Sequence, residues 1–149
     1  MKPRTRARSL ALQVLYEIDL TDHLPGPVYQ ERLQEMNADK QNNLSPELAE
    51  FARQIIFGIL PLAEKLDDAI AHYAPEWPFE QISPIDRNIL RIATWEFVVS
   101  KETPVKVAIN EAVELAKLFG SDTAPRFING VLGSLADRYY ELKQQFEES

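Results

Sequence analysis

The chain has no cysteine among its 149 residues, which excludes disulfide bonds and thiolate metal sites. Its two histidines, His23 and His72, lie far apart in the sequence and have no metal-ligand partners at useful spacing. No apolar run approaches the roughly 20 residues that a membrane-spanning helix needs. The N-terminus also lacks an apolar segment behind its charges, so no secretory signal is expected. These absences predict a soluble protein of the reducing cytoplasm, without metal or cofactor.

Catalytic signatures are scarce as well. The five glycines form no loop of the kind that cradles a phosphate, and no serine stands in a nucleophile-elbow context. Asp67 and Asp68 are neighbours on a predicted helix, so their side chains point to different sides and do not form an acid/base pair. The sequence therefore indicates a binding protein rather than an enzyme.

Charge is unevenly distributed along the chain. The net charge of -7 by itself argues against a nucleic-acid partner. Residues 1–8, however, hold four cations and no acid, so residues 9–149 carry -11. We call this basic start the N-terminal arm; its cations are Lys2, Arg4, Arg6 and Arg8.

Apolar residues recur at spacings of three and four throughout, and no alternation of period two competes with them. Ser45-Pro46, Ser83-Pro84 and Thr103-Pro104 each combine a capping residue with a proline suited to a first helical turn. In the stretch 83–99, where Asp86 sits in a position to close a capping box, the apolar residues cover more than one face. This stretch is predicted to be the hub of an all-α fold of about seven helices without strands. The expected helices span 4–20, 28–36, 45–59, 62–73, 83–99, 103–119 and 124–146.

The first predicted helix carries an informative polar face. Arg6, Ser9, Gln13 and Tyr16 follow one another at spacings of three, four and three, which places a cation, a hydroxyl, an amide and a ring on one outer stripe. Cations near a helix N-terminus oppose the helix dipole, and this arrangement favours an anionic partner. The alternative is a solvated arm with Tyr16 half buried.

A second candidate surface lies between Lys117 and Asn129. Here a turn between helices meets an incoming helix N-terminus, which offers free amide donors to an anion. Phe127 at the edge of the apolar stripe and Arg126 beside it suit an unstacked base and its phosphate. The alternative is a capped turn with Phe127 in the core.

Several blocks of the sequence resemble the NusB transcription antitermination factor family. The blocks are Thr103–Lys117, Phe119-Gly120, Arg126–Leu132 and Ile89–Ala93, together with the opening Arg4–Tyr16. These blocks occur in the order that the family shows and cover most of the chain. By this resemblance, residues 1–149 are identified as a single NusB-like RNA-binding domain.

The resemblance implies a fold of two small packed helical bundles and a factor that binds the boxA element of ribosomal RNA transcripts. It further implies a heterodimer with NusE, the small-subunit ribosomal protein, within the RNA polymerase antitermination complex. The NusE surface would include Asp86. The RNA surface would comprise Lys2, Arg4, Arg6, Arg8, Gln13, Tyr16, Thr123, Arg126, Phe127 and Asn129.

Two other functions were weighed. NusB-like domains also occur fused to methyltransferases, but this sequence contains no glycine-rich cofactor loop. A helical protein-interaction scaffold or homodimer without direct RNA contact is the second alternative. The sequence leaves open whether the free protein is a monomer or a homodimer.

Overall fold

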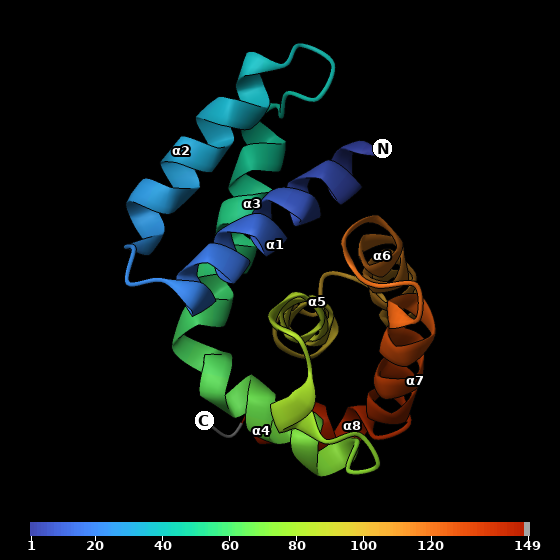
Figure 1. Cartoon of the computed structure of the whole chain (residues 1–149). Coiled ribbons are helices and arrows are strands. Elements are labelled where there is room, and N and C mark those ends of the chain that lie inside the picture. Colours follow the sequence, from blue (N-terminus) through green and yellow to red (C-terminus); the bar gives the residue numbers. More distant parts are fainter. Residues whose placement is uncertain (148–149) are drawn as a thin grey trace. The chain divides into compact units, whose positions relative to one another are not determined.

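The computed structural model describes residues 1–147, which are largely helical and contain no strand. The contacts between residues divide the chain into two compact units, Met1–Gly58 and a second unit that begins at Ile59. Figure 1 shows the helices of each unit. Among the described residues, no helix is both long and apolar enough to cross a membrane.

Helices of the second unit gather around α5. Helix α6 packs along α7, and both of them pack on α5, which also contacts α4 (Figure 1). The helices of this unit are α4 (Ala63–Tyr73), α5 (Pro84–Thr94), α6 (Val105–Phe119), α7 (Ala124–Ala136) and α8 (Tyr139–Glu147), with 3-10 turns at Leu60–Leu62 and Phe79–Gln81.

Helix α5 is the expected hub. It begins with Ser83 at the N-cap, whose Oγ accepts a hydrogen bond of 3.2 Å from the backbone N–H of Asp86. The Asp86 side chain also hydrogen-bonds with Ser83, while its Oδ1 atom is buried without a hydrogen-bond partner. All residues from Asn88 to Thr94 are buried, which agrees with a helix packed on several sides.

The hub stretch does not remain an α-helix to its end. After Thr94 it widens into a π-helix over Trp95–Ser100, and Lys101 then ends it with a left-handed φ of 61°. The buried carboxylate of Glu96 within this segment accepts a hydrogen bond of 2.8 Å from the hydroxyl of Thr103. Sequence periodicity did not indicate this change of helix type.

A partly buried ion pair joins α5 to α4. The guanidinium of Arg91, whose residue is 7% exposed, donates from Nε to Oδ1 of Asp67 at 2.7 Å and from Nη2 to Oδ2 at 2.6 Å. This two-pronged geometry is the strong form of an arginine–carboxylate contact. Asp67 is therefore part of the contact that holds α4 against α5.

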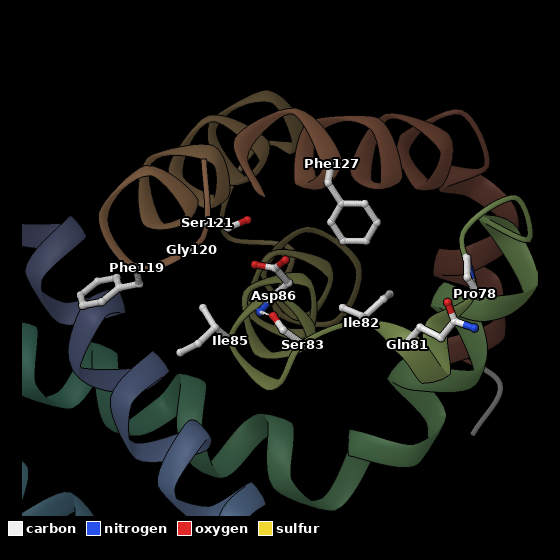
Figure 2. A pocket seen from close by; sticks show the side chains of 10 residues that line it. All are labelled: Pro78, Gln81, Ile82, Ser83, Ile85, Asp86, Phe119, Gly120, Ser121 and Phe127. Atoms are coloured by element: carbon white, nitrogen blue, oxygen red, sulfur yellow. Dashed lines mark hydrogen bonds between the residues drawn. The ribbon is translucent and has the colours of Figure 1, made fainter. Parts of the chain in front are cut away.

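Gly120 sets the close approach between α6 and α7. A Cβ atom on Gly120 would lie 2.6 Å from Cβ of Ala124, 2.9 Å from the carbonyl oxygen of Ala116 and 3.3 Å from Oδ1 of Asp86. Figure 2 shows Gly120 beside the Asp86 carboxylate at the start of α5. Only a residue without a side chain fits at this turn without displacing its neighbours.

The first unit consists of α1 (Pro3–Leu20), α2 (Pro25–Ala38) and α3 (Pro46–Ile59). Helix α1 packs along α2, and the Tyr29 hydroxyl of α2 donates to the Ala49 carbonyl of α3 at 2.9 Å. Helix α2 is longer than the predicted 28–36. Pro25 and Pro27 stand in its first turn, where the missing N–H groups would have had no partner within the helix.

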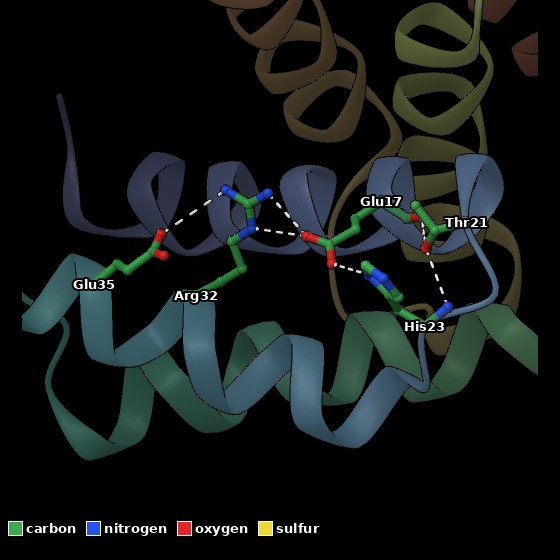
Figure 3. A network of polar contacts seen from close by, with 5 residues as sticks. All are labelled: Glu17, Thr21, His23, Arg32 and Glu35. Carbon is green, nitrogen blue, oxygen red and sulfur yellow. Dashed lines mark hydrogen bonds and ion pairs between the residues drawn. The ribbon is translucent and has the colours of Figure 1, made fainter.

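A polar network ties the end of α1 to α2 (Figure 3). Oε1 of Glu17 accepts hydrogen bonds from Nη2 and Nε of Arg32 at 2.8 and 3.2 Å, while Oε2 lies 2.8 Å from Nδ1 of His23. The Thr21 hydroxyl donates to the Glu17 carbonyl at 2.8 Å. Hydrogen bonds from His23 and then Arg32 lower the pKa of Glu17 below its usual 4.5.

The prediction of an all-α fold, with about seven helices in two small bundles, is confirmed for the described residues. The last predicted helix is divided, since a turn at Asp137 and Arg138 separates α7 from α8. The expected kink at Pro61 is the 3-10 turn Leu60–Leu62 between α3 and α4.

We predict that Gly120→Ala lowers the free energy of unfolding by about 1–3 kcal/mol, because the new methyl group overpacks the turn between α6 and α7. Gly133→Ala is the matched control: Gly133 lies within α7, and a Cβ there meets nothing within 4 Å. That variant is expected to gain about 0.5–1 kcal/mol. Denaturant unfolding measures both, and equal stability of the two variants would contradict the packing argument.

We predict that Glu17→Gln lowers the Tm slightly at neutral pH and that this difference fades in acid. The folded state lowers the pKa of Glu17, so the stabilisation is complete above about pH 4.5 and is lost as the pH falls through the folded pKa. Thermal unfolding of both proteins between pH 7 and 3 measures this. Glu35→Gln is the control, since Glu35 is exposed and 3.9 Å from Nη1 of Arg32; a pH-independent Glu17→Gln effect would contradict the assignment.

Candidate nucleic-acid interface

The N-terminal arm leads into α1: Lys2 is its N-cap residue, and residues 3–8 lie in its first two turns. The first turn contains no acidic residue. Lys2 and Arg4 are exposed, and Arg6 is half-buried. Nη1 of Arg6 donates to the Met1 carbonyl at 2.8 Å. The first turn of α1 therefore presents cations to solvent, as the sequence predicted.

Arg8 differs from the prediction. It is only 3% exposed, and its guanidinium carbon lies 5.1 Å from the centroid of the Phe51 ring. Arg4 lies over the same ring at 4.6 Å, so the two arginines share one aromatic partner on α3. Arg8 is thus withdrawn from the surface available to a phosphate. Its place four residues before the buried Leu12 was the available sequence signal.

The polar stripe on α1 is narrower than predicted. Ser9 is 2% exposed, and its hydroxyl accepts a hydrogen bond of 3.3 Å from Nε2 of the half-buried Gln13. The expectation that Ser9 faces outward was wrong, because this small side chain belongs to the buried face that also holds Thr5. Tyr16 is 36% exposed, which leaves part of its ring available for stacking.

The predicted residues at the start of α7 form the Phe127 corner, which comprises Thr123, Arg126, Phe127 and Asn129. Thr123 is at the N-cap position without capping through its side chain, and its Oγ1 lies 3.4 Å from Oγ of Ser121. Arg126 and Asn129 are exposed and three residues apart, hence on neighbouring positions of one helix face.

Phe127 itself is half-buried and does not belong to the inner core. Its ring meets Trp77 edge to face, with 6.4 Å between centroids and 77° between planes. Gly130 allows this arrangement, since a Cβ there would lie 3.1 Å from the Trp77 ring. The Trp77 contact fixes the orientation of Phe127 without covering it.

A pocket of about 530 Å³ opens between the start of α5 and the start of α7 (Figure 2). Its volume is in the range of small-ligand sites, about 300–1,000 Å³. Its lining residues are Pro78, Gln81, Ile82, Ser83, Ile85, Asp86, Phe119, Gly120, Ser121 and Phe127. The sequence did not indicate this pocket, although it marked Gly120 as a helix stop.

The pocket brings Asp86 and Phe127 together, two residues that the sequence assigned to different partners. Figure 2 shows the carboxylate and the ring directed into the same space. Burial raises the pKa of Asp86 above its usual 3.8, and hydrogen bonding with Ser83 opposes this with a smaller effect. The pocket is thus lined mostly by apolar residues, and Oδ1 of Asp86, one of its lining residues, is buried without a hydrogen-bond partner.

The remaining acidic and histidine side chains do not suggest a metal centre. Within residues 1–147, no group of three His, Cys, Asp or Glu residues is placed to hold a metal ion.

Comparison with known proteins gives one family. The profile described as "NusB family" matches residues 5–137. The transcription antitermination protein NusB of Roseiflexus sp. (strain RS-1) is 46% identical over 143 residues, which cover 95% of this chain and 96% of that protein. NusB of Bacillus pumilus (strain SAFR-032) is 41% identical over 145 residues, covering 97% of this chain and all of its own length.

Solved structures agree with these sequence matches. NusB of T. maritima shares 31% identity with a TM-score of 0.79, over 96% of this chain and 98% of that one. A chain from a crystal structure of the antitermination factors NusB and NusE in complex with dsRNA shares 26% identity with a TM-score of 0.80, over 93% of this chain and 99% of that one. The fold, the family profile and the curated relatives coincide over nearly the whole length, so this chain belongs to the NusB family.

Proposed function

We propose that this chain is a transcription antitermination factor that binds boxA RNA together with NusE and joins the elongating RNA polymerase complex. Relatives at 40–48% identity are transcription antitermination proteins, and a similar structure holds NusB with NusE and dsRNA. The observation that carries the proposal for this chain is the exposed cationic first turn of α1 on an otherwise acidic protein. The factor is non-catalytic and acts in the cytoplasm, where transcripts form.

Two surfaces would hold the RNA. Lys2, Arg4 and Arg6 supply charge for the phosphates, while Gln13 and the exposed part of Tyr16 face bases. The second surface is the Phe127 corner, where Arg126 and Asn129 are exposed beside the ring. Arg8 acts indirectly in this scheme, since it shares the Phe51 ring with Arg4 and so helps to hold the first turn in place.

The NusE surface would include Asp86 at the start of α5. Residues 9–149 carry -11, a charge that repels RNA and attracts a basic protein. A basic partner protein would therefore be attracted to the acidic residues of this chain and would contribute phosphate contacts of its own. This division explains why a net acidic chain would bind RNA as one half of a heterodimer.

We predict that replacing Lys2, Arg4 and Arg6 together by alanine weakens boxA RNA binding by about 10- to 100-fold at roughly 0.1 M salt. Loss of three phosphate contacts would also reduce the slope of log K against log [salt] by about 2. Filter-binding titrations against boxA RNA and a scrambled RNA, at several salt concentrations, measure both effects.

The matched control replaces Arg53, Lys106 and Arg138, which are exposed and lie outside both surfaces, and so removes the same charge. It should retain nearly full affinity. If the two triple variants bind alike, the arm makes no specific contact. If the arm variant keeps both RNA binding and antitermination activity, the protein is a scaffold that does not touch RNA.

We predict that the isolated chain binds boxA RNA weakly and with strong salt dependence, and that added NusE tightens binding at least about 10-fold. The measurement is the same titration with and without saturating NusE. Equal affinity in both conditions would contradict the proposed sharing of phosphate contacts.

A further inference from the structure

The ring of Phe51 lies outside the surfaces that would touch RNA, although two arginines of the N-terminal arm meet it. Phe51 is half-buried in the first half of α3. The guanidinium carbons of Arg4 and Arg8 lie 4.6 and 5.1 Å from the ring centroid. Both distances are below the roughly 6 Å over which a cation is attracted to an aromatic face. All three residues belong to the first unit, so these contacts form within one compact part of the chain.

The helix that carries the two arginines does little to stabilise them. Arg4 and Arg8 are four residues apart, so they lie one turn apart on the same face of α1, where like charges repel each other. The first turn of α1 contains no acidic residue, and the positive end of the helix dipole opposes the charge of Arg4. The negative face of the Phe51 ring is therefore a stabilising contact for both cations.

An aromatic ring holds an arginine in a different way from a carboxylate. An ion pair with Asp or Glu would neutralise the guanidinium and occupy some of its N–H donors. Contact with the face of a ring orients the guanidinium but leaves its charge uncompensated. Arg4 is exposed, whereas Arg8 is only 3% exposed. Of the two cations, Arg4 is thus the one that the ring presents to an anion in solution.

We propose that Phe51 is a positioning residue for RNA binding, whose ring holds the Arg4 guanidinium in place with its charge free for a phosphate. Phe51 itself does not touch the RNA. The inference rests on the RNA binding proposed above. An unrestrained arginine samples many rotamers, and fixing one of them on binding reduces affinity. Because the ring already restricts Arg4 in the free protein, less conformational entropy is lost when RNA binds.

The test compares the full chain with Phe51→Leu and with a variant in which Phe51 is replaced by 3,4,5-trifluorophenylalanine. Leucine is apolar but has no aromatic face. Fluorination keeps the ring but withdraws electron density from its face, which removes the attraction for a cation. In filter-binding titrations with boxA RNA, both variants should bind about 3- to 10-fold more weakly than the wild-type chain. Tm values show that each variant is folded, and the fluorinated variant carries the test if Phe51→Leu does not fold.

Two further measurements separate positioning of Arg4 from stabilisation of the first unit. Phe51→Leu should keep the slope of log K against log [salt], because Arg4 still reaches its phosphate, whereas Arg4→Ala should reduce that slope by about 0.7. In the double variant Arg4→Ala/Phe51→Leu, loss of the ring should weaken binding little beyond Arg4→Ala alone. A ring that only stabilised the fold would reduce affinity by the same factor with and without Arg4.

Phe57→Leu is the matched control on the same helix. Phe57 is 38% exposed, and the guanidinium carbon of Arg53 lies 5.5 Å from its ring centroid. This pair is a second arginine–ring contact of α3, but Arg53 lies outside both proposed RNA surfaces. Phe57→Leu should therefore keep its affinity for boxA RNA within about 2-fold of the wild-type value.

Four outcomes would overturn the inference. Tighter binding by Phe51→Leu would mean that the ring withdraws Arg4 from RNA. Wild-type affinity of the fluorinated variant would mean that the electron-rich face of the ring plays no part. If both Phe51 variants bind like the wild-type chain while Arg4→Ala binds more weakly, the arm contacts RNA without help from the ring and the proposed function stands. If the wild-type chain binds boxA and scrambled RNA equally well, the proposed function fails together with the inference.

Discussion

Burial of α5 on several sides is the constraint on which the second unit depends. Every residue from Asn88 to Thr94 is buried, and the two longest polar side chains among them, Asn88 and Arg91, have hydrogen-bond partners. Arg91 finds one in Asp67 of α4, and Asn88 donates to the Pro84 carbonyl at 2.8 Å. The turn between α6 and α7 lies close to the start of α5, where a Cβ on Gly120 would lie 3.3 Å from Oδ1 of Asp86. Asp86 and Gly120 also line the pocket at this place.

The second feature that organises the molecule is the separation of positive from negative charge along the chain. The N-terminal arm concentrates cations on the first turn of α1, where they oppose the helix dipole instead of complementing it. Two of these cations have an aromatic partner, since Arg4 and Arg8 both lie over the ring of Phe51. An arrangement that is mildly unfavourable in the free protein is the one expected when an anionic ligand completes it. The acidic remainder of the chain then favours a basic protein as the second partner.

Much of the candidate site could be predicted from the sequence because its signals are local. Spacing along one helix indicated Gln13 and Tyr16, and a ring beside a cation at a helix start indicated Phe127 and Arg126. What failed was the assumption that polar residues on a helix face outward. Arg8 and Ser9 are both buried, since an arginine can lie over an aromatic ring and a serine is small enough for a packed face.

Caps, prolines and apolar spacing predicted where most helices begin, because these signals act over a few residues. They missed the first turn of α2 and the break between α7 and α8. The sequence by itself also determined the family, through long blocks in a fixed order. The tertiary structure alone decided that α5 relaxes into a π-helix, that Arg8 is withdrawn from the surface, and that Asp86 and Phe127 face one pocket. These features depend on contacts between residues distant in the chain, such as the 41 positions that separate Asp86 from Phe127. Helical periodicity carries no information about such contacts.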